Sequence, residues 1–466
     1  MKLRHTILAG IACTGLAACG AEDTTDNGPG TEQRAATGKF DQNGNRKEDA
    51  WDYRNDPDRL AEFASVNLVK KLSELPTKAY LATAAWTDTY WPTYMDSTNV
   101  QWQGKGTLSP LQKYDAAFNE WMVPGNFSEL RAYDPRNCDD GFDAEYYESQ
   151  GPAARWMSEN KGNKKARDLV YRNGADSEPV CDDQTSEAVE TWWGLCHAWA
   201  PASINEPEPI HPVTLNGVTF YAADIKALMQ TVYDRSTSRI LGGRCNTKEP
   251  ERDERGRIKD AACRDTNAGS FHVIMSNFLG IHNMALLEDR TYNYEVWNQP
   301  VVGFEVTQMT EIDVAKANEL LGVEGDTYIY NDDAKRFAEV FATVKYITES
   351  GPEAEPLMPS ISRYTRSDNY QYILEMDADG NIIGGEWLQG RAQHTRWGIS
   401  EQPDFLWYST GPADGAYGRN PYVNYEKVKQ LLEMSRRAPE GDGDETRKVY
   451  VFETPRLIPD NDHAGV

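Results

Sequence analysis

A cysteine in an unusually aromatic stretch is the strongest candidate for chemistry in this chain of 466 residues. Cys196 lies in ETWWGLCHAWAPASI, where three tryptophans surround it and His197 follows it directly. A cysteine attacks as its thiolate, which the N-terminus of a helix or a nearby cation favours. We therefore expect Cys196 in the first turn of a short helix. His197 is a poor partner for it, because neighbouring residues on a helix point in different directions.

A cysteine nucleophile also needs an imidazole, and the imidazole needs an acceptor that orients it. His272 is the first choice, because SFHVIMSNFLGI predicts an apolar strand with this histidine at its start. His282, at the other end of that strand, is the second choice. Asn298 ends the strand predicted over YEVWNQP and is the expected acceptor, with Asp289 and Glu295 as carboxylate alternatives. The order cysteine, histidine, asparagine is that of papain-like enzymes, although the papain-type local pattern around the cysteine is absent.

The cysteine count indicates that Cys196 is unpaired. Seven cysteines are present, and two of them lie in the first 19 residues, which leaves an odd number in the folded part. Cys245 and Cys263 bracket a charged, loop-like insert that a disulfide would close, and Cys138 and Cys181 are the natural second pair. Spacing alone does not prove these pairings. A metal site is disfavoured, because no CxxC and no clustered histidines and cysteines occur.

The first residues predict export. MKLRHTILAGIACTGLAACG has a basic start, a short apolar run and small residues before Cys19, so residues 1–18 are predicted to be a signal peptide. Leu16-Ala17-Ala18-Cys19 resembles a bacterial lipoprotein signal, in which Cys19 becomes the lipid-bearing first residue. An ordinary secretory signal is the alternative. Residues 19–48 are predicted to be a flexible tether, and the anchor is expected at a bacterial membrane, with the outer membrane or cell surface preferred.

Composition excludes some partners. A formal net charge of -25 argues against binding to nucleic acid and to anionic lipid headgroups, so a lipid anchor is the only expected contact with a membrane. A hydrophobic content of 39% over this length is enough for a large core with two regions.

Local patterns predict an α+β fold. Residues 49–180 read as a helical, aromatic-rich region, in which Asp56 and Pro57 precede a predicted helix over LAEFASVNLVKKLSELP. Asn216-Gly217 predicts a tight hairpin, and Asp224 is expected to cap the next helix. Most later segments alternate like strands. Residues 181–466 are therefore predicted to hold a papain-like catalytic core, with the helix of Cys196 packed on an antiparallel sheet.

Two specific segments of the chain are WWGLCHAWAPASI and VWNQPVVGF. Together they resemble the transglutaminase elicitor family, secreted enzymes best known from oomycete plant pathogens. The resemblance runs from about Asp49 into the C-terminal region. The second segment is similar to the surface peptide that plants perceive in that family. It departs from the peptide at Val302 and Glu305, where the family has basic residues, so the resemblance does not extend to elicitor potency.

The resemblance implies protein-glutamine gamma-glutamyl transfer, usually calcium-dependent, on a papain-like core. Cys196 would attack a glutamine carboxamide, His272 would protonate the departing ammonia, and a lysine amine would resolve the thioester. Tryptophans that exclude water would favour the amine over hydrolysis. The candidates for such a substrate-binding entrance, each of which also fits plain core packing, are Trp192, Trp193, Trp199 and Trp297.

The segment EMDADGNIIGGE contains a calcium-like pattern, with Asp377 and Asp379 at positions that match ligands of an EF-hand loop. The flanking residues read as strands, which favours a hairpin with an acidic turn. These two aspartates remain the candidate ligands for calcium.

Two alternatives to a transglutaminase stay open. One is a papain-like peptidase or amidase, in which water resolves the same thioester. The other is a non-catalytic surface binding protein that uses the aromatic cleft for a ligand.

Overall fold

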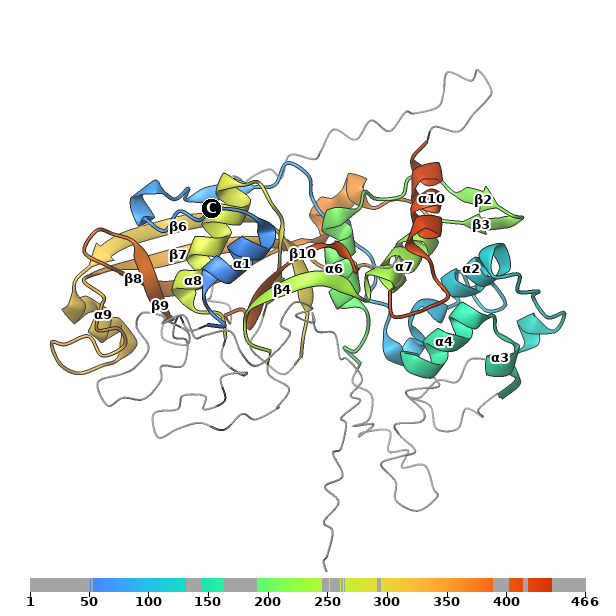
Figure 1. The fold of residues 1–466 in the computed structure, drawn as a ribbon, viewed down its shortest axis with the longest axis horizontal. Coiled ribbons are helices and arrows are strands. Elements are labelled where there is room, and N and C mark those ends of the chain that lie inside the picture. Colours follow the sequence, from blue (N-terminus) through green and yellow to red (C-terminus); the bar gives the residue numbers. More distant parts are fainter. Residues whose placement is uncertain are drawn as a thin grey trace, which may run out of the picture.

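The computed structural model describes residues 51, 53–130, 144–162, 191–244, 251, 260, 263, 265–290, 295–388, 402–413 and 418–437. A long antiparallel sheet occupies one half of the molecule, and short helices with a small hairpin occupy the other (Figure 1). Helices α6 and α7 lie between the two halves.

The main sheet of the described residues has eight strands in the order β4-β10-β5-β6-β7-β8-β9, with β1 pairing to β6 beside this path. All of its pairings are antiparallel. A separate hairpin joins β2 and β3. The strands are β1 Lys78–Tyr80, β2 Val213–Leu215, β3 Val218–Phe220, β4 Ser236–Gly242, β5 Leu286–Asp289, β6 Asn298–Ile312, β7 Arg336–Ile347, β8 Thr365–Met376, β9 Ile382–Trp387 and β10 Phe405–Pro412.

The helices are short, and none in the described ranges is long and apolar enough to cross a membrane. They are α1 Pro57–Ala64, α2 Pro110–Phe118, α3 Ala144–Ser149, α4 Pro152–Asn160, α6 Cys196–Asn205, α7 Ala222–Tyr233, α8 Ala268–Met275, α9 Val314–Leu321 and α10 Tyr425–Arg436, with a π-helix over Ser276–Ile281. Single 3₁₀ turns cover Leu72–Glu74, Thr93–Met95, Ser97–Asn99 and Phe127–Glu129, and a longer one covers Met358–Tyr364.

The first helix begins three residues before the predicted segment LAEFASVNLVKKLSELP and ends earlier than that segment does. The Asp56 side chain accepts from the N–H of Asp58 at 3.0 Å, and Pro57 occupies the first helical position. The predicted helix continued to Pro76, but α1 ends at Ala64 because Ser65 adopts a left-handed conformation with φ 58°. A single residue at positive φ stops a helix whatever apolar spacing follows.

The predicted tight hairpin is confirmed. Asn216 and Gly217 have φ of 49° and 78°, as a two-residue turn of type I′ requires, and they join β2 to β3. The predicted cap at Asp224 was wrong by three residues. The N-cap of α7 is Tyr221, and Asp224 lies in the first turn, where its carboxylate accepts from the Tyr221 N–H at 2.8 Å.

The apolar run that contains His272 forms α8 and the π-helix, and the predicted strand was wrong. The Asn267 side chain caps the helix by accepting from the N–H groups of Gly269 and Ser270. Every residue of α8 is buried, so the run shows neither a helical stripe nor a strand-like alternation. Gly269 permits the tight packing on β9, because a Cβ there would lie 2.2 Å from the carbonyl oxygen of Gly384.

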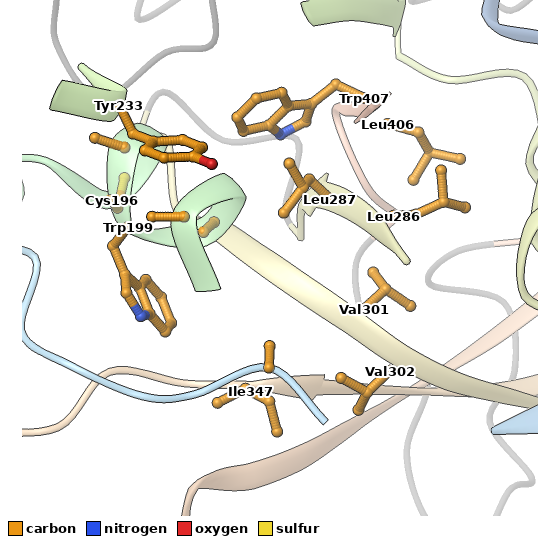
Figure 2. Close-up of a cluster of buried hydrophobic side chains, with 14 of the residues drawn as sticks. Cys196, Trp199, Tyr233, Leu286, Leu287, Val301, Val302, Ile347, Leu406 and Trp407 are labelled. Atoms are coloured by element: carbon orange, nitrogen blue, oxygen red, sulfur yellow. The ribbon is translucent and has the colours of Figure 1, made fainter. Parts of the chain in front are cut away.

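The fold class is confirmed as α+β, with α6 packed against α7, β6 and β10. Figure 2 shows Cys196 and Trp199 on α6, in a core that includes Tyr233 and side chains of the sheet. The region predicted to be helical also contributes a strand, because β1 pairs with β6. That pairing joins residues more than 200 positions apart, which no local pattern reports.

The buried carboxyl group of Asp88 lies beside α7, in the segment that follows β1. Asp88 is 1% exposed, and one of its oxygens accepts from the side chains of Trp91 at 3.3 Å and Gln230 at 2.7 Å. Burial raises the pKa of Asp88 to about 7, although Lys226 opposes this shift. The folded protein therefore keeps a proton here at pH values where the unfolded chain has released it.

Replacing Asp88 with asparagine is expected to change how stability depends on pH. As pH rises from about 4 to about 7, only the unfolded wild-type chain ionises at this position, so wild-type stability falls by up to about 4 kcal/mol. Asp88→Asn removes that loss, and its melting temperature should exceed that of wild type at pH 8 and match it near pH 4. The control is Asp379→Asn in an exposed turn, which should follow wild type. Parallel curves for Asp88→Asn and wild type would refute a protonated Asp88.

Candidate active site

Cys196 is the first residue of α6, as the sequence predicts. The helix has no side-chain cap at its N-terminus, and the N–H of Leu195, just before it, donates to the carbonyl oxygen of Tyr90 at 2.5 Å. The helix dipole makes such an N-terminus favourable for a negative charge. The position therefore suits a thiolate.

The Cys196 thiol contacts two groups at and just before the start of β6. The side-chain nitrogen of Asn298, the first residue of β6, donates to the Cys196 sulfur at 3.5 Å. The thiol also lies 3.6 Å from the carbonyl oxygen of Val296. Cys196 and Asn298 are both fully buried, and Cys196 is a free cysteine, as the cysteine count predicts. The amide of Asn298 is thus a hydrogen-bond donor to sulfur, a different contact from the predicted one with an imidazole.

Asp289 and Glu295, the carboxylate alternatives to Asn298, both accept hydrogen bonds from Trp297, the residue before Asn298. Asp289, which pairs with Asn298 across the sheet, accepts from the backbone N–H of Trp297 at 2.9 Å. The Trp297 indole N–H donates to Glu295 at 3.0 Å. Asp289 is fully buried, so this bond holds the chain where it enters β6. It thereby places the amide that faces the thiol.

His272 is a core residue on α8. It is 3% exposed, and its Nδ1 lies 2.8 Å from the hydroxyl oxygen of Tyr372. The two rings also make an edge contact, with 5.9 Å between their centroids. Burial lowers the pKa of His272 to about 4. This imidazole is therefore neutral near pH 7 and is held by a tyrosine of β8.

The register of the sheet places His272 far from the thiol. Tyr372 pairs with Val340, and Val340 pairs with Met309. Met309 lies eleven residues along β6 from Asn298, which is about 35 Å at about 3.3 Å per residue. A histidine side chain bonded to Tyr372 does not span that distance. The structure therefore contradicts the predicted contact of His272 with Cys196 and Asn298, because the long antiparallel strands separate them.

Replacing His272 with glutamine is expected to leave catalysis nearly unchanged. The rate of reaction at Cys196 should stay within about threefold of wild type, while stability should fall by about 1–3 kcal/mol through the disturbed contact with Tyr372. Thermal unfolding and initial rates on the same preparation measure the two effects. Loss of activity at an unchanged melting temperature would contradict the separation argued from the register.

Two other described histidines also have side-chain contacts of their own. His282 lies 2.9 Å from the backbone carbonyl oxygen of Asn67, so the second-choice imidazole is held by a loop. His197 lies 2.7 Å from a carboxylate oxygen of Asp234. Sequence reasoning missed this pair, because the residues are 37 positions apart and no motif links them. His394 and His463 lie outside the described residues.

The four candidate tryptophans differ in exposure: two are buried and two are only partly buried. Trp199 is fully buried, and its indole N–H donates to the carbonyl oxygen of Trp86 at 3.2 Å. Trp192 is 3% exposed. The burial of Trp192 and Trp199 matches plain core packing, the alternative that the sequence left open, and Trp199 belongs to the buried cluster in Figure 2. Trp193 and Trp297 are only partly buried and remain candidates for contact with substrate.

Aromatic packing continues from Trp297 to the segment that precedes α6. The ring of Tyr90 contacts the ring of Trp297 edge-on, with 5.3 Å between centroids. Tyr90 is also the residue whose carbonyl accepts from Leu195. One segment therefore touches both the start of α6 and the start of β6.

The predicted calcium pattern forms the turn of the β8–β9 hairpin. Asp377 accepts from the backbone N–H groups of Asp379 and Asn381 and from the Asn381 side chain, at 2.8 to 2.9 Å. These bonds already use both carboxylate oxygens. No group of three or more histidine, cysteine or acidic side chains suited to a metal occurs in the described part of the chain. The hydrogen bonds of Asp377 explain this turn without a metal, and calcium at Asp377 and Asp379 stays a prediction.

The remaining cysteine predictions are tested only in part. Cys263 is disulfide-bonded, and its partner lies outside the described residues, so pairing with Cys245 stays a prediction. The predicted bond between Cys138 and Cys181 and the lipid on Cys19 also fall outside the described ranges.

The fold and site define an α+β protein with a free thiol at the start of a helix that packs on an antiparallel sheet, an arrangement suited to a cysteine nucleophile. The family model "Transglutaminase elicitor" matches residues 56–438, and the chain belongs to this family. The crystal structure of the GP42 transglutaminase from Phytophthora sojae is similar, with a TM-score of 0.59 and 29% sequence identity. The match covers 82% of this chain and 97% of that one. None of the curated proteins matches.

The segment that resembles the plant-perceived peptide is the start of β6. Its residues from Asn298 to Phe304 are buried in this chain, and exposure begins only near Glu305. The first half of this segment therefore belongs to the site and the core, and does not form a surface.

Proposed function

We propose that this protein is a protein-glutamine gamma-glutamyltransferase that works through a thioester on Cys196. The observation that carries the proposal is the bond from the Asn298 amide to a free thiol at the start of α6, in a chain of the transglutaminase elicitor family. Glutamine side chains of proteins or peptides would be the acyl donors, and lysine or other primary amines the acceptors. The reaction is an acyl transfer in two steps.

In the first step the Cys196 thiolate attacks the carboxamide carbon of glutamine. A carbon–sulfur bond forms, the carbon–nitrogen bond breaks, and ammonia leaves with a proton from a general acid. In the second step an amine attacks the thioester and loses a proton, and sulfur departs as thiolate. Both steps pass through an oxyanion. The backbone N–H of Cys196 and the amide of Asn298 are the donors beside the sulfur that suit it.

Water exclusion favours transfer over hydrolysis. Cys196 has no exposed surface, so a substrate has to displace covering side chains before it reaches the sulfur. Trp193 and Trp297 are partly exposed and border the two elements that meet at the thiol. A donor glutamine that fills this space would shield the thioester from water until an amine arrives.

The mechanism still needs an imidazole that protonates the departing ammonia. His272 is too far from Cys196 along the sheet. A substitution series over the histidines, with His394 included, identifies this acid by a loss of turnover that leaves the melting temperature unchanged.

The test of the proposed function is incorporation of a biotinylated primary amine into a glutamine-containing protein. Amine incorporation by wild type with release of ammonia supports transfer. Release of ammonia without incorporation, or cleavage of peptide bonds, would instead assign an amidase or peptidase that shares the thioester. No reaction of any kind would favour a binding protein. Parallel samples with calcium and with a chelator test the calcium dependence that the family resemblance implies.

We further propose that the protein acts outside the cytoplasm, held to a bacterial membrane by lipid on Cys19. Its substrates would then be proteins of the cell envelope or surroundings. Metabolic labelling with a fatty acid, lost in Cys19→Ser, tests this location.

A further inference from the structure

One buried ion cluster joins the first turn of α6 to three other segments. Its centre is Asp234, the C-cap residue of α7, with a side chain only 1% exposed. One oxygen of Asp234 lies 2.7 Å from Nε2 of His197 and 2.5 Å from Nζ of Lys161. Arg419 lies 3.9 Å from the same oxygen and also donates to the Asp234 backbone carbonyl. We refer to these four residues as the Asp234 cluster.

The Asp234 carboxylate is ionised near neutral pH. Burial alone would raise the pKa of Asp234, but Lys161 and His197 together lower it to about 2. A buried carboxylate with charged partners resists displacement, because moving it away from them leaves an uncompensated charge. The cluster is therefore a rigid attachment point, and His197 is the member that belongs to α6.

The position of His197 on the helix connects this attachment to the nucleophile. Successive residues of an α-helix point about 100° apart, so holding one side chain determines where its neighbour points. With His197 bound to Asp234 on α7, Cys196 is turned toward β6. There its sulfur lies 3.5 Å from the amide of Asn298. A small rotation of the first turn would break that contact, since hydrogen bonds weaken steeply with distance and angle.

We infer that His197 is a positioning residue, which through Asp234 sets the rotation of the first turn of α6 and so aims the Cys196 thiol at the Asn298 amide. This role rests on the proposed function for its effect on turnover. Its effect on the reactivity of the thiol does not depend on that function.

Three variants separate positioning from general stability. His197→Ala removes the attachment but leaves Asp234 paired with Lys161, whereas His197→Gln keeps an N–H group that can reach the carboxylate. Lys161→Met is the matched control, because Lys161 contacts the same oxygen and lies just after α4. His197→Ala is expected to lower kcat by about 10- to 100-fold with little change in KM, as a slightly misplaced nucleophile would. His197→Gln should recover kcat to within about threefold of wild type, and Lys161→Met should lower stability without lowering kcat.

A double-mutant cycle with Asn298→Ala tests whether His197 affects kcat through the contact between Cys196 and Asn298. If His197 acts by aiming the thiol at Asn298, adding His197→Ala to Asn298→Ala should cost much less than it does alone. Three results would overturn the inference. The losses of kcat from His197→Ala and Asn298→Ala could multiply in the double variant. The kcat of His197→Ala could equal that of wild type, or Lys161→Met could lose as much kcat as His197→Ala.

Alkylation of Cys196 by iodoacetamide keeps this test separate from the test of function. The rate should fall in His197→Ala and recover in His197→Gln, whether or not wild type transfers amines. Wild type that alkylates in this pattern and shows no transfer would refute the proposed function alone. Transfer by wild type, with equal alkylation rates in all variants, would refute the positioning role alone.

Discussion

Cys196→Ala is expected to abolish amine incorporation, with a loss of at least about 10³-fold, because no other described side chain at the site can form the thioester. The structural cost should be small. The sulfur is buried and makes weak contacts to Asn298 and Val296, so removal of one atom should cost about 1 kcal/mol of stability. Initial rates with a biotinylated amine and thermal unfolding measure the two effects.

Cys196→Ser is the matched control for this experiment. A serine keeps the size and a hydrogen-bonding group at the start of α6, but its hydroxyl is a much poorer nucleophile than a thiolate. It should therefore be as inactive as alanine while unfolding near the wild-type temperature. Residual incorporation by both variants above about one tenth of wild type would show that the acyl group is carried elsewhere.

Asn298→Ala has the next largest expected effect, a loss of kcat of about 10²- to 10³-fold. The Asn298 amide is the side-chain donor that the structure places on the sulfur, so it would stabilise both the thiolate and the oxyanion that follows. KM should change little, because the donor acts mainly on the charged states. Alkylation of Cys196 should also slow, since less thiolate would form at a given pH.

Gln299→Ala is the control for the Asn298 variant. Gln299 follows Asn298 in β6, so its side chain points to the opposite face of the strand, where it donates to Glu349 at 2.9 Å. Both residues are buried, and their loss should have comparable effects on stability. Equal losses of kcat in the two variants would assign the effect of Asn298 to strand packing, and an active Asn298→Ala would remove it from the chemistry.

Asn298 was predicted as a site residue, but the contact that it makes differs from the predicted one. Its place before a proline and beside a tryptophan indicated a site, and it does lie against Cys196. The predicted partner was the imidazole of His272. The amide faces the sulfur itself because β6 begins at Asn298, whereas the sequence predicted that a strand would end there.

Features that depend on near neighbours in the chain were predictable. The turn at Asn216-Gly217 and the hairpin around Asp377 both follow from bonds within a few residues. The free state of Cys196 followed from an odd count. Its position at a helix start was also predicted. In each case the decisive interaction spans only a few residues or depends on composition alone.

The sequence by itself therefore determined the candidate nucleophile, the α+β class and the family resemblance, because these depend on residue types and short spacings. Only the tertiary structure decided the partners of the nucleophile. It separated His272 from Cys196 through the register of β6, β7 and β8, and it bound His197 to Asp234 on another helix. Strand register and helix packing bring together residues tens to hundreds of positions apart, and buried apolar runs such as that of α8 have no periodicity from which to read them.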